Sequence, residues 1–338
     1  MSSAGGDEAQ LLAVLRRALG PRADGPGVEI GIGDDAAVLR LPPGRLVATV
    51  DMLVEGQHFV RQGPMAASPA DIGWQALAVN VSDIAAMGGR PLWVLCSLGL
   101  PADLAPGELE DVYTGIAEAA SAFGVAVAGG NLARLAERLV LDVTALGVAE
   151  RPLRRGRAQP GDSLCVTGRL GAAAAGLRLA KGAAAPPAGA DALLEALRRP
   201  RPRIQEGMAL AALDGVRSAC DVSDGLVVDL RRLLGPGVDA VLWEDQLPVP
   251  DAVRAAAAAA GADPLEWVLH GGGDYELVCA VVPNALAAAR AAVAAAGGVP
   301  LHAIGECAAG APGGRVSLAA ARGGPPRALD PRGWDPFR

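Results

Sequence analysis

Residues 69–88, "PADIGWQALAVNVSDIAAMG", and residues 91–100, "PLWVLCSLGL", decide the fold class. The first stretch starts at a proline and ends at a glycine, which are typical residues for the beginning and the end of a helix. The second is a nearly unbroken apolar run of strand length, so it predicts a buried strand. A helix followed directly by a buried strand indicates an α/β protein.

The alternation of helix and strand continues on both sides of this region and restarts near residues 148–160. We therefore expect two domains, 1–150 and 151–338, as the length of 338 residues also suggests. In the first domain we predict helices over 7–19 and 106–124, and strands over 46–50 (ending on Asp51), 125–130 (running into a glycine turn) and 139–147. In the second we predict strands over 163–167, 239–244 and 275–282, and helices over 171–180, 190–198, 203–213, 225–234, 250–260 and 284–297.

The composition limits the possible partners and compartments. The formal charge is −7 and the pI about 5.1, and no basic block occurs, which argues against a nucleic-acid or anionic-membrane partner. The five cysteines are scattered without a C-x-x-C pair, which predicts reduced, buried thiols in a cytoplasmic protein. The N-terminal segment does not resemble a signal peptide, and no apolar run is long enough to span a membrane.

Lysine is almost missing from the chain. Among 30 basic residues Lys181 is the one lysine, and it lies in an Ala/Pro/Gly-rich segment. This excludes a phosphate-binding loop of the G-x-x-x-x-G-K-[ST] type.

Carboxylates recur where predicted strands meet glycine-rich segments. Asp34 and Asp35 follow a glycine bend in "GIGDDAAVL", and Asp51 follows Thr49 on the same face of a strand. Asn80 and Asp83 are spaced i and i+3 on one helix. Asn131, the pair Asp221 and Asp224, and Asp274 lie beside further glycines. Ligands of α/β proteins bind where strands end, so these residues are candidates for a site.

Carboxylates repel phosphates, but Mg²⁺ can join the two. It prefers oxygen ligands and retains water and phosphate oxygens in its shell. We therefore interpret the acidic residues as ligands of magnesium ions that hold a nucleotide polyphosphate in place of the missing lysine.

Structural roles are the alternative for each of these residues. Single aspartates beside glycine often cap helices or form turns, which applies to Asp224 and Asp274. Asp142 and Asp162 are expected on the surface of a strand and of a turn. In the same way, His58 could pack against a loop, and Tyr113 and Trp334 could belong to the core.

Seven segments, in this order, resemble the thiamine-monophosphate kinase family. They are "GIGDDAAVL", "DMLVEGQHF", "ALAVNVSDIAAMGGRPLWVLCSLGLP", "PGDSLCVTGRLG", "RPRPRIQEGMAL", "CDVSDGLVVDL" and "GGGDYEL". The resemblance extends from about residue 7 to the C-terminal "GWDPF", and "AVNVSDIAAMG" is its most specific part.

This resemblance implies the two-domain α/β (α+β) fold of the aminoimidazole ribonucleotide synthetase superfamily. Residues 1–150 would bind ATP and Mg²⁺ and form a homodimer through the strands of a mixed sheet, and residues 151–338 would complete the substrate site. The implied reaction is the Mg-ATP-dependent phosphorylation of thiamine monophosphate to thiamine diphosphate.

The resemblance also implies roles for individual residues. The metal ligands would be Asp34, Asp35, Thr49, Val50, Asp51, Asp83, Asn131, Asp221 and Asp224; of these, Asp34, Asp35, Asp51, Asp83 and Asp224 would be catalytic. The nucleotide would contact Tyr113, Gly130, Asn131, Arg155 and Ser223, with Arg154 as an alternative to Arg155. The thiamine phosphate would contact His58, Gly273 and Trp334.

Two positions depart from the family pattern. The chain has Asn131 where the family has an aspartate, and Gly273 where it has a glutamate. Each change removes one carboxylate, so a weaker magnesium site and an altered acceptor are expected. Two alternative functions follow: a related ATP-dependent synthetase acting on another acceptor, or a nucleotide-binding homologue with weakened catalysis.

Overall fold

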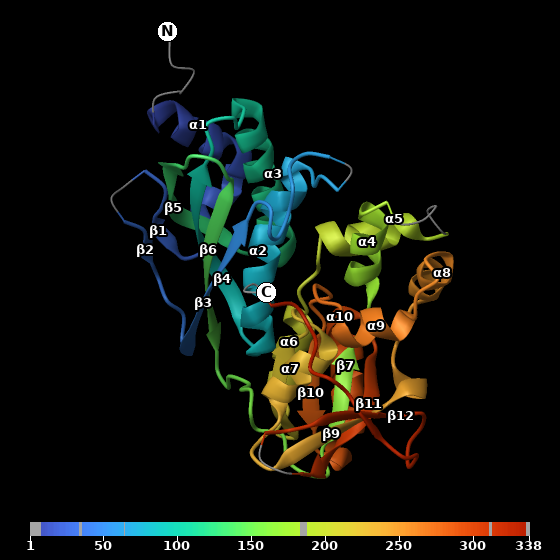
Figure 1. Cartoon of the computed structure of the whole chain (residues 1–338). Coiled ribbons are helices and arrows are strands. Elements are labelled where there is room, and N and C mark those ends of the chain that lie inside the picture. The colour runs from blue at the N-terminus through green and yellow to red at the C-terminus, as the bar shows by residue number, and fades with distance from the viewer. Residues whose placement is uncertain (1–7, 34–35, 64, 183–187, 311–312, 336–338) are drawn as a thin grey trace. The chain divides into compact units, whose positions relative to one another are not determined.

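The structure is a computed structural model that describes residues 8–33, 36–63, 65–182, 188–310 and 313–335 (Figure 1). The chain forms two compact units. Unit 1 comprises Met1–Val81 and Pro91–Val148, and unit 2 comprises Ser82–Arg90 and Ala149–Arg338. Both contain helices and sheets, which confirms the predicted α/β (α+β) class.

Unit 1 contains a four-stranded sheet in the order β3-β6-β4-β5, with β4 and β5 parallel. Its strands are β3 (Arg45–Val54), β4 (Arg90–Leu100), β5 (Ala126–Arg134) and β6 (Val140–Ala149); its helices are α1 (Glu8–Leu19), η1 (Gly20–Asp24), α2 (Pro69–Ala86) and α3 (Pro106–Phe123). The short strands β1 (Val28–Ile30) and β2 (Val38–Leu39) form a separate antiparallel ribbon.

Two glycines bring α2 and α3 into close contact. A Cβ at Gly73 would lie 2.0 Å from the carbonyl oxygen of Val112, and one at Gly115 would lie 1.8 Å from that of Ala70. Any larger residue would therefore separate the helices. The ring of Trp74 on α2 meets that of Phe123 on α3 edge to face, with the centroids 5.2 Å apart.

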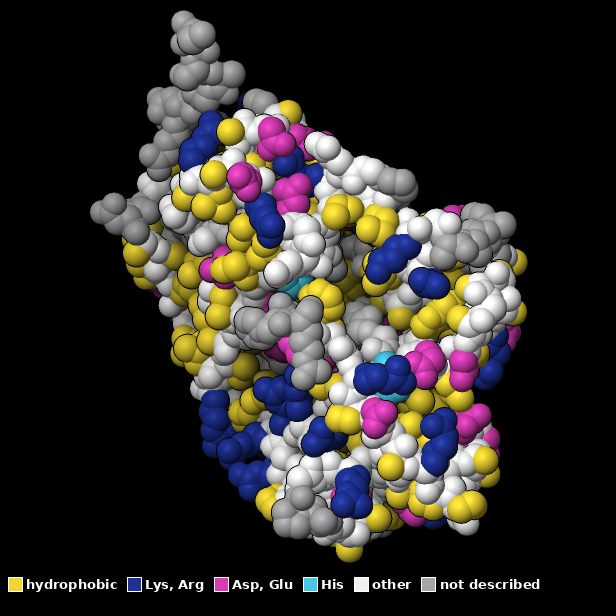
Figure 2. Space-filling view, in the orientation of Figure 1, with side chains coloured by type: hydrophobic (Ala, Val, Ile, Leu, Met, Phe, Trp, Pro, Cys, Tyr) yellow, Lys and Arg dark blue, Asp and Glu magenta, His cyan; other side chains and the backbone are white. Residues whose placement is uncertain are grey.

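The side chains of β3 differ between its two faces. Leu46, Val50 and Met52 point to one face and are 54%, 57% and 50% exposed. Figure 2 shows apolar side chains gathered over the region of β1 to β3. Thr49 and Asp51 point to the opposite face because successive strand residues alternate.

Two predictions about strand ends in unit 1 are wrong. β3 does not end on Asp51 but continues to Val54, because Met52, Leu53 and Val54 suit a strand as well. Gly129 and Gly130 do not form a turn but lie within β5. A Cβ at Gly130 would lie 1.9 Å from the carbonyl oxygen of Cys96 on β4, so glycine permits close strand pairing here.

Unit 2 contains a seven-stranded sheet in the order β13-β12-β9-β11-β7-β10-β8. Its strands are β7 (Ser163–Thr167), β8 (Val216–Asp221), β9 (Val238–Trp243), β10 (Leu277–Val281), β11 (Leu301–Ala309), β12 (Val316–Ala319) and β13 (Arg327–Ala328). Its helices are α4 (Ala172–Ala180), α5 (Ala190–Arg198), α6 (Ile204–Ala211), α7 (Leu226–Leu233), α8 (Asp251–Ala259), α9 (Pro264–His270) and α10 (Leu286–Gly297), with the short turns η2 (Glu244–Gln246) and η3 (Pro283–Ala285).

Both faces of this sheet are covered. One core joins the sheet to α7 and α9 through residues such as Leu230 and Val268, and another joins it to α6 and α10 through residues such as Leu210 and Val293. A smaller core lies between α4, α5 and α8 (Figure 1). The interior strand β10, between β7 and β8, is accordingly buried over its whole length.

The predicted helices are confirmed to within a few residues, and all five cysteines are free and buried as predicted. Asp162 is in a turn, but it is 3% exposed and paired with Arg217, so the prediction of a surface position is wrong. Asp142 is half-buried on β6, and its Oδ1 is buried without a hydrogen-bond partner. No helix in the described part of the chain is long and apolar enough to cross a membrane.

Candidate functional site

The predicted site residues fall in both units, and each group is described within its own unit. Asp34 and Asp35, which follow the glycine bend, lie outside the described residues.

In unit 1, α2 fixes the strand that carries Asp51. The backbone N–H of Asp51 donates to Asn80 Oδ1 at 2.8 Å, and Asn80 Nδ2 donates to the carbonyl of Ala76 at 2.9 Å. Asn80 is fully buried, so its amide is oriented by both bonds. Asp51 is exposed, which leaves its carboxylate accessible beside the half-buried Thr49.

His58 lies in a turn directly after β3. Its ring Nδ1 accepts a hydrogen bond from the backbone N–H of Val54 at 3.0 Å. The backbone N–H of His58 donates to the carbonyl of Val54. Burial lowers the pKa of His58, so the imidazole is neutral at pH 7. The ring therefore stabilises the turn, which agrees with the alternative that His58 packs against a loop.

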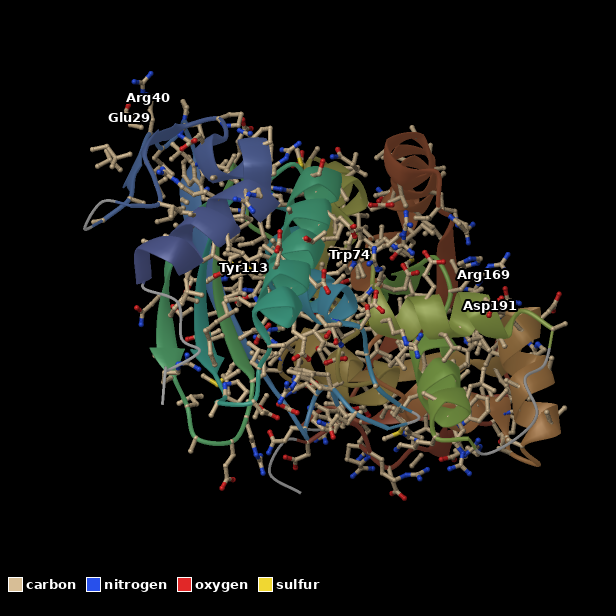
Figure 3. The ribbon with its side chains drawn as sticks, turned by 90° about the horizontal axis from the view of Figure 1, so that it is seen from above. Glu29, Arg40, Trp74, Tyr113, Arg169 and Asp191 are labelled. Carbon is tan, nitrogen blue, oxygen red and sulfur yellow. The ribbon has the colours of Figure 1, made fainter. Side chains whose placement is uncertain are left out.

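Tyr113, Gly130 and Asn131 come together at a cavity of about 90 Å³ in unit 1. Leu12 and Leu15 of α1, Ile32, Cys96, Val127, Gly129 and Leu132 complete its lining. Tyr113 extends from α3 toward the sheet (Figure 3), and burial raises the pKa of its phenol. The cavity thus combines apolar walls with the neutral hydroxyl of Tyr113 and the amide of Asn131.

In unit 2, Asp221 ends β8 as a buried carboxyl group. Ser82 Oγ donates to Asp221 Oδ2 at 2.6 Å, and Asp221 is 8% exposed. Burial, and next the charge of Asp83, raise the pKa of Asp221 to about 7. Such a raised pKa indicates that the charged form of Asp221 is poorly stabilised in its buried position.

The loop after β8 is organised by Asp229 on α7. Asp229 Oδ2 accepts the backbone N–H groups of Ser223, Asp224 and Gly225 at 3.1, 3.0 and 3.1 Å. Arg232 pairs with Asp229 at 2.7 Å and with Asp224 at 2.6 Å. The backbone and the carboxylate of the loop are therefore both held from α7.

The C-terminal segment and the glycine-rich loop before β10 lie against the same loop. The N–H of Trp334 donates to the carbonyl of Asp224 at 2.8 Å, and that of Gly273 donates to the carbonyl of Ser223 at 2.9 Å. Trp334 is 47% exposed, so it is not a core anchor. Burial raises the pKa of the Cys220 thiol on β8. Of the two candidate arginines, Arg155 is near enough to this thiol for its charge to oppose that rise.

Asp274 and Glu276 have structural roles. Asp274 accepts the N–H groups of Gly171 and Ala173 at the start of α4, as its predicted capping role requires. Glu276 is bound bidentately by Arg203, at 2.7 and 2.6 Å, and also accepts from the hydroxyl of Thr167. Both line a cavity of about 570 Å³ between α4, α5 and α8, whose lining holds four arginines and four carboxylates and, apart from Asp274, none of the candidate site residues.

Among the described residues, no group of three or more His, Cys, Asp or Glu side chains is arranged to hold a metal ion. Unit 2 does bring Asp83, Asp221 and Ser82 together, and it places Ser223 and Asp224 in the loop that follows. Ser82, Asp229 and Arg232 were not predicted as site residues from the sequence. The motif "SDGLVVDLRR" contains the latter two, but only the turn of α7 brings them back onto the loop.

Two family models match the chain. The model of the AIR synthase related protein, N-terminal domain, matches residues 33–149, and that of the C-terminal domain matches residues 159–316. Together they span most of both units.

Curated proteins and solved structures are similar over nearly the whole length. Thiamine-monophosphate kinase of Escherichia coli K12 is 37% identical over 318 residues, 92% of each chain. The crystal structure of thiamine-monophosphate kinase from Stenotrophomonas maltophilia is 36% identical, with a TM-score of 0.78, covering 90% of this chain and 95% of that one. The structure of AaThiL complexed with AMPPCP and TMP is 29% identical, with a TM-score of 0.75, covering 97% and 96%.

Proposed function

The chain belongs to the thiamine-monophosphate kinase family, and from this we propose that it transfers the γ-phosphate of ATP to thiamine monophosphate, giving thiamine diphosphate and ADP. A homologue bound to AMPPCP and TMP supports both substrates. Residues 1–150 would bind the nucleotide and residues 151–338 would complete the acceptor site.

The observation that carries the proposal is the carboxyl group of Asp221. It is buried beside Asp83, and burial, followed by the charge of Asp83, raises its pKa to about 7. A divalent cation would offset the negative charge of these two carboxylates, so the donor set fits magnesium. When bound, Mg²⁺ would neutralise the charge on the transferring phosphoryl group.

We propose the further ligands Thr49, the backbone carbonyl of Val50, Asp51, Asn131 and Asp224, together with Asp34 and Asp35. The exposed position of Asp51, on a backbone that Asn80 holds in place, supports this assignment. Hydroxyl, amide and carboxylate oxygens are the ligands that magnesium prefers.

The nucleotide would use the cavity at Tyr113, Gly130 and Asn131. Its apolar walls suit a purine base, and the neutral Tyr113 hydroxyl and the Asn131 amide can each donate and accept a hydrogen bond. Ser223 and Arg155 would meet the phosphates. His58, Gly273 and Trp334 would contact the acceptor.

The chain's own residues would act by orientation. The acceptor is a phosphate monoester, whose second pKa of about 6 leaves its oxygens largely ionised at neutral pH. No general base is needed, which agrees with the neutral, turn-bound His58. Asp229 holds the Ser223–Gly225 backbone in place, so catalysis would come from alignment of the two phosphates and not from proton transfer.

Homodimer formation and a cytoplasmic location are part of the same proposal. The exposed Leu46, Val50 and Met52 form an apolar face of the kind that marks a contact with another protein surface. A second copy of this sheet would cover it. The five buried free thiols suit a reducing compartment such as the cytoplasm.

The test is direct. Purified protein with ATP, Mg²⁺ and thiamine monophosphate should release thiamine diphosphate and ADP in equal amounts, measured by chromatography. Asp221→Asn should abolish product formation, whereas Asp162→Asn, in a buried pair elsewhere in unit 2, should not. ADP release that does not depend on thiamine monophosphate would exclude the proposed acceptor.

A second candidate is a nucleotide-binding homologue with weakened catalysis, favoured by Asn131 and Gly273. Nucleotide-dependent thermal stabilisation without ADP formation would support it. Asn131→Asp restores the missing charge and should then raise turnover. Gly273→Glu is a poorer test, because Gly273 has φ +89°, where a side chain is strained.

A further inference from the structure

Arg232 connects two carboxylates that belong to different parts of the loop region. Its Nη2 lies 2.6 Å from Asp224 Oδ2, and its Nη1 lies 2.7 Å from Asp229 Oδ1. The side chain of Asp229 is 2% exposed, that of Asp224 is 22% exposed and that of Arg232 is 41% exposed. The guanidinium group thus joins a buried carboxylate, that of Asp229, to a partly solvent-exposed one, that of Asp224.

The two carboxylates differ in their other bonds. Asp229 is committed to the fold, since its Oδ2 accepts three backbone N–H groups of the loop. The backbone N–H of Asp224 donates to Asp229, and its backbone carbonyl accepts from Trp334. Its carboxylate, by contrast, is paired with Arg232. A cation that competes with Arg232 would therefore compete for Asp224 and not for Asp229.

We propose that Arg232 is a resident counter-ion for Asp224, which a divalent cation displaces on binding. Asp229 is the positioning residue that retains the guanidinium group afterwards, so that displacement leaves no charge unpaired. The proposal rests on the proposed function, because that function makes Asp224 a metal ligand. It adds that Arg232 and the divalent cation compete for Asp224, and that this competition sets the affinity of the nucleotide-free protein for the cation.

The charges give the direction of the effect. Two effects weaken the binding of a divalent cation at Asp224. The positive charge of Arg232 repels the cation, and the ion pair between Arg232 and Asp224 has to be broken. Removing the guanidinium group should therefore strengthen cation binding, although it deletes a native contact. Weakening the hold of Asp229 on Arg232 should do the opposite, because Arg232 then pairs with Asp224 alone.

The experiment measures Mn²⁺ binding to the full chain without nucleotide, by the electron paramagnetic resonance signal of free Mn²⁺. Arg232→Gln should lower the Kd at least about threefold, which corresponds to the upper range for a partly exposed ion pair. Asp229→Asn should raise it. Arg232→Lys retains the charge and should leave the Kd within about twofold of the parent value.

Arg231→Gln is the matched control. Arg231 is the neighbouring residue on α7, and its guanidinium group donates to the carbonyls of Gly313 and Gly314. It removes the same charge without touching a carboxylate of the loop, so the Kd should hardly change. In the background of Asp224→Asn, Arg232→Gln should no longer tighten binding.

Each outcome decides between the two proposals. An equal or higher Kd for Arg232→Gln in a folded variant, checked by circular dichroism, overturns the competition, as does a parent protein that binds no Mn²⁺. A parent protein that binds Mn²⁺ with the expected variant shifts but forms no thiamine diphosphate overturns the kinase assignment alone. The two failures are therefore distinguishable.

Discussion

The strands β3 and β10 both carry apolar residues but have opposite surroundings. β10, an interior strand between β7 and the edge strand β8 of the seven-stranded sheet, is buried at every residue because helices cover both faces. β3, at the edge of the four-stranded sheet, has one buried residue, Leu53, and exposes Leu46, Val50 and Met52. Unit 2 therefore completes its own core, whereas in unit 1 the described residues leave an apolar face of β3 exposed. The predictions below test this difference, from the largest effect to the smallest.

The largest effect is expected for Glu276, which anchors the buried end of β10. Glu276→Ala leaves Arg203 without its bidentate partner and should cost about 3–5 kcal/mol of folding free energy. Denaturant unfolding measures it. The control is Glu195→Ala, whose ion pair with Arg201 is long, at 3.4 Å, and exposed, and it should change the midpoint little. Equal effects would mean that the burial of Glu276 is irrelevant.

The helix-covered side of unit 1 should be as intolerant as the core of unit 2. Gly115→Ala forces a Cβ to within 1.8 Å of the carbonyl oxygen of Ala70 and should cost about 1–3 kcal/mol. Gly107, in the same helix α3, has open space around it, so Gly107→Ala should stabilise by about 0.4–1 kcal/mol. Thermal unfolding should show a lower Tm for Gly115→Ala and a higher Tm for Gly107→Ala. An unchanged Tm for Gly115→Ala would mean that α2 and α3 can separate without cost.

Two valines test the strands directly. Val278→Ala on β10 removes fully buried methyl groups and should cost about 2 kcal/mol. Val50→Ala on β3 should leave the free energy of unfolding of the dilute protein within about 0.5 kcal/mol and weaken dimer formation. Analytical ultracentrifugation measures the second effect. A Val50 variant with an unchanged sedimentation profile would argue against the sheet as the dimer interface.

The smallest effect, when counted per pH unit, is a pH dependence that unit 2 should show in the presence of a chelator. The folded-state pKa of Asp221 is about 7, above its ordinary value of 3.8, so the folded protein holds a proton that the unfolded chain has lost between those values. Stability should fall as the pH rises from about 4 to 7.

Asp221→Asn should reduce that slope by about 1 kcal/mol per pH unit. The slope that remains would come from Asp229, whose pKa burial raises to about 6, and from Asp274, whose pKa burial raises to about 7. Denaturant titrations at several pH values measure it. An unchanged slope in Asp221→Asn would mean that this carboxyl group is already ionised at low pH.

Long elements with one strong local signal could be predicted from the sequence. The helix over 106–124 has a proline at its start and a glycine at its end, and the structure gives Pro106–Phe123 with Gly124 in the left-handed conformation. The strand expected over 163–167, directly after the turn residues "PGD", is observed with the same bounds. β11, β12 and β13 were missed, because their residues give no pattern that distinguishes a strand from the neighbouring loops.

The failures depended on contacts between distant parts of the sequence. Gly130 is a glycine because the carbonyl of Cys96, on the adjacent strand, occupies the space of a side chain, and the sequence alone suggests a turn. The same holds for the site. Its acidic residues could be named from the sequence, whereas the roles of Asp229 and Ser82 required the loop and helix to be in place.

The distribution of thiols makes the protein its own reporter of unfolding. Cys96 lies in unit 1, and Cys165, Cys220, Cys279 and Cys307 lie in unit 2, and all five are buried. Burial raises the pKa of the Cys96 thiol to about 12, which lowers its reactivity in the folded protein. An alkylating reagent added in a brief pulse can modify a thiol only after its unit opens. Peptide mass spectrometry after such pulses would time the opening of the two units separately, without any engineered label.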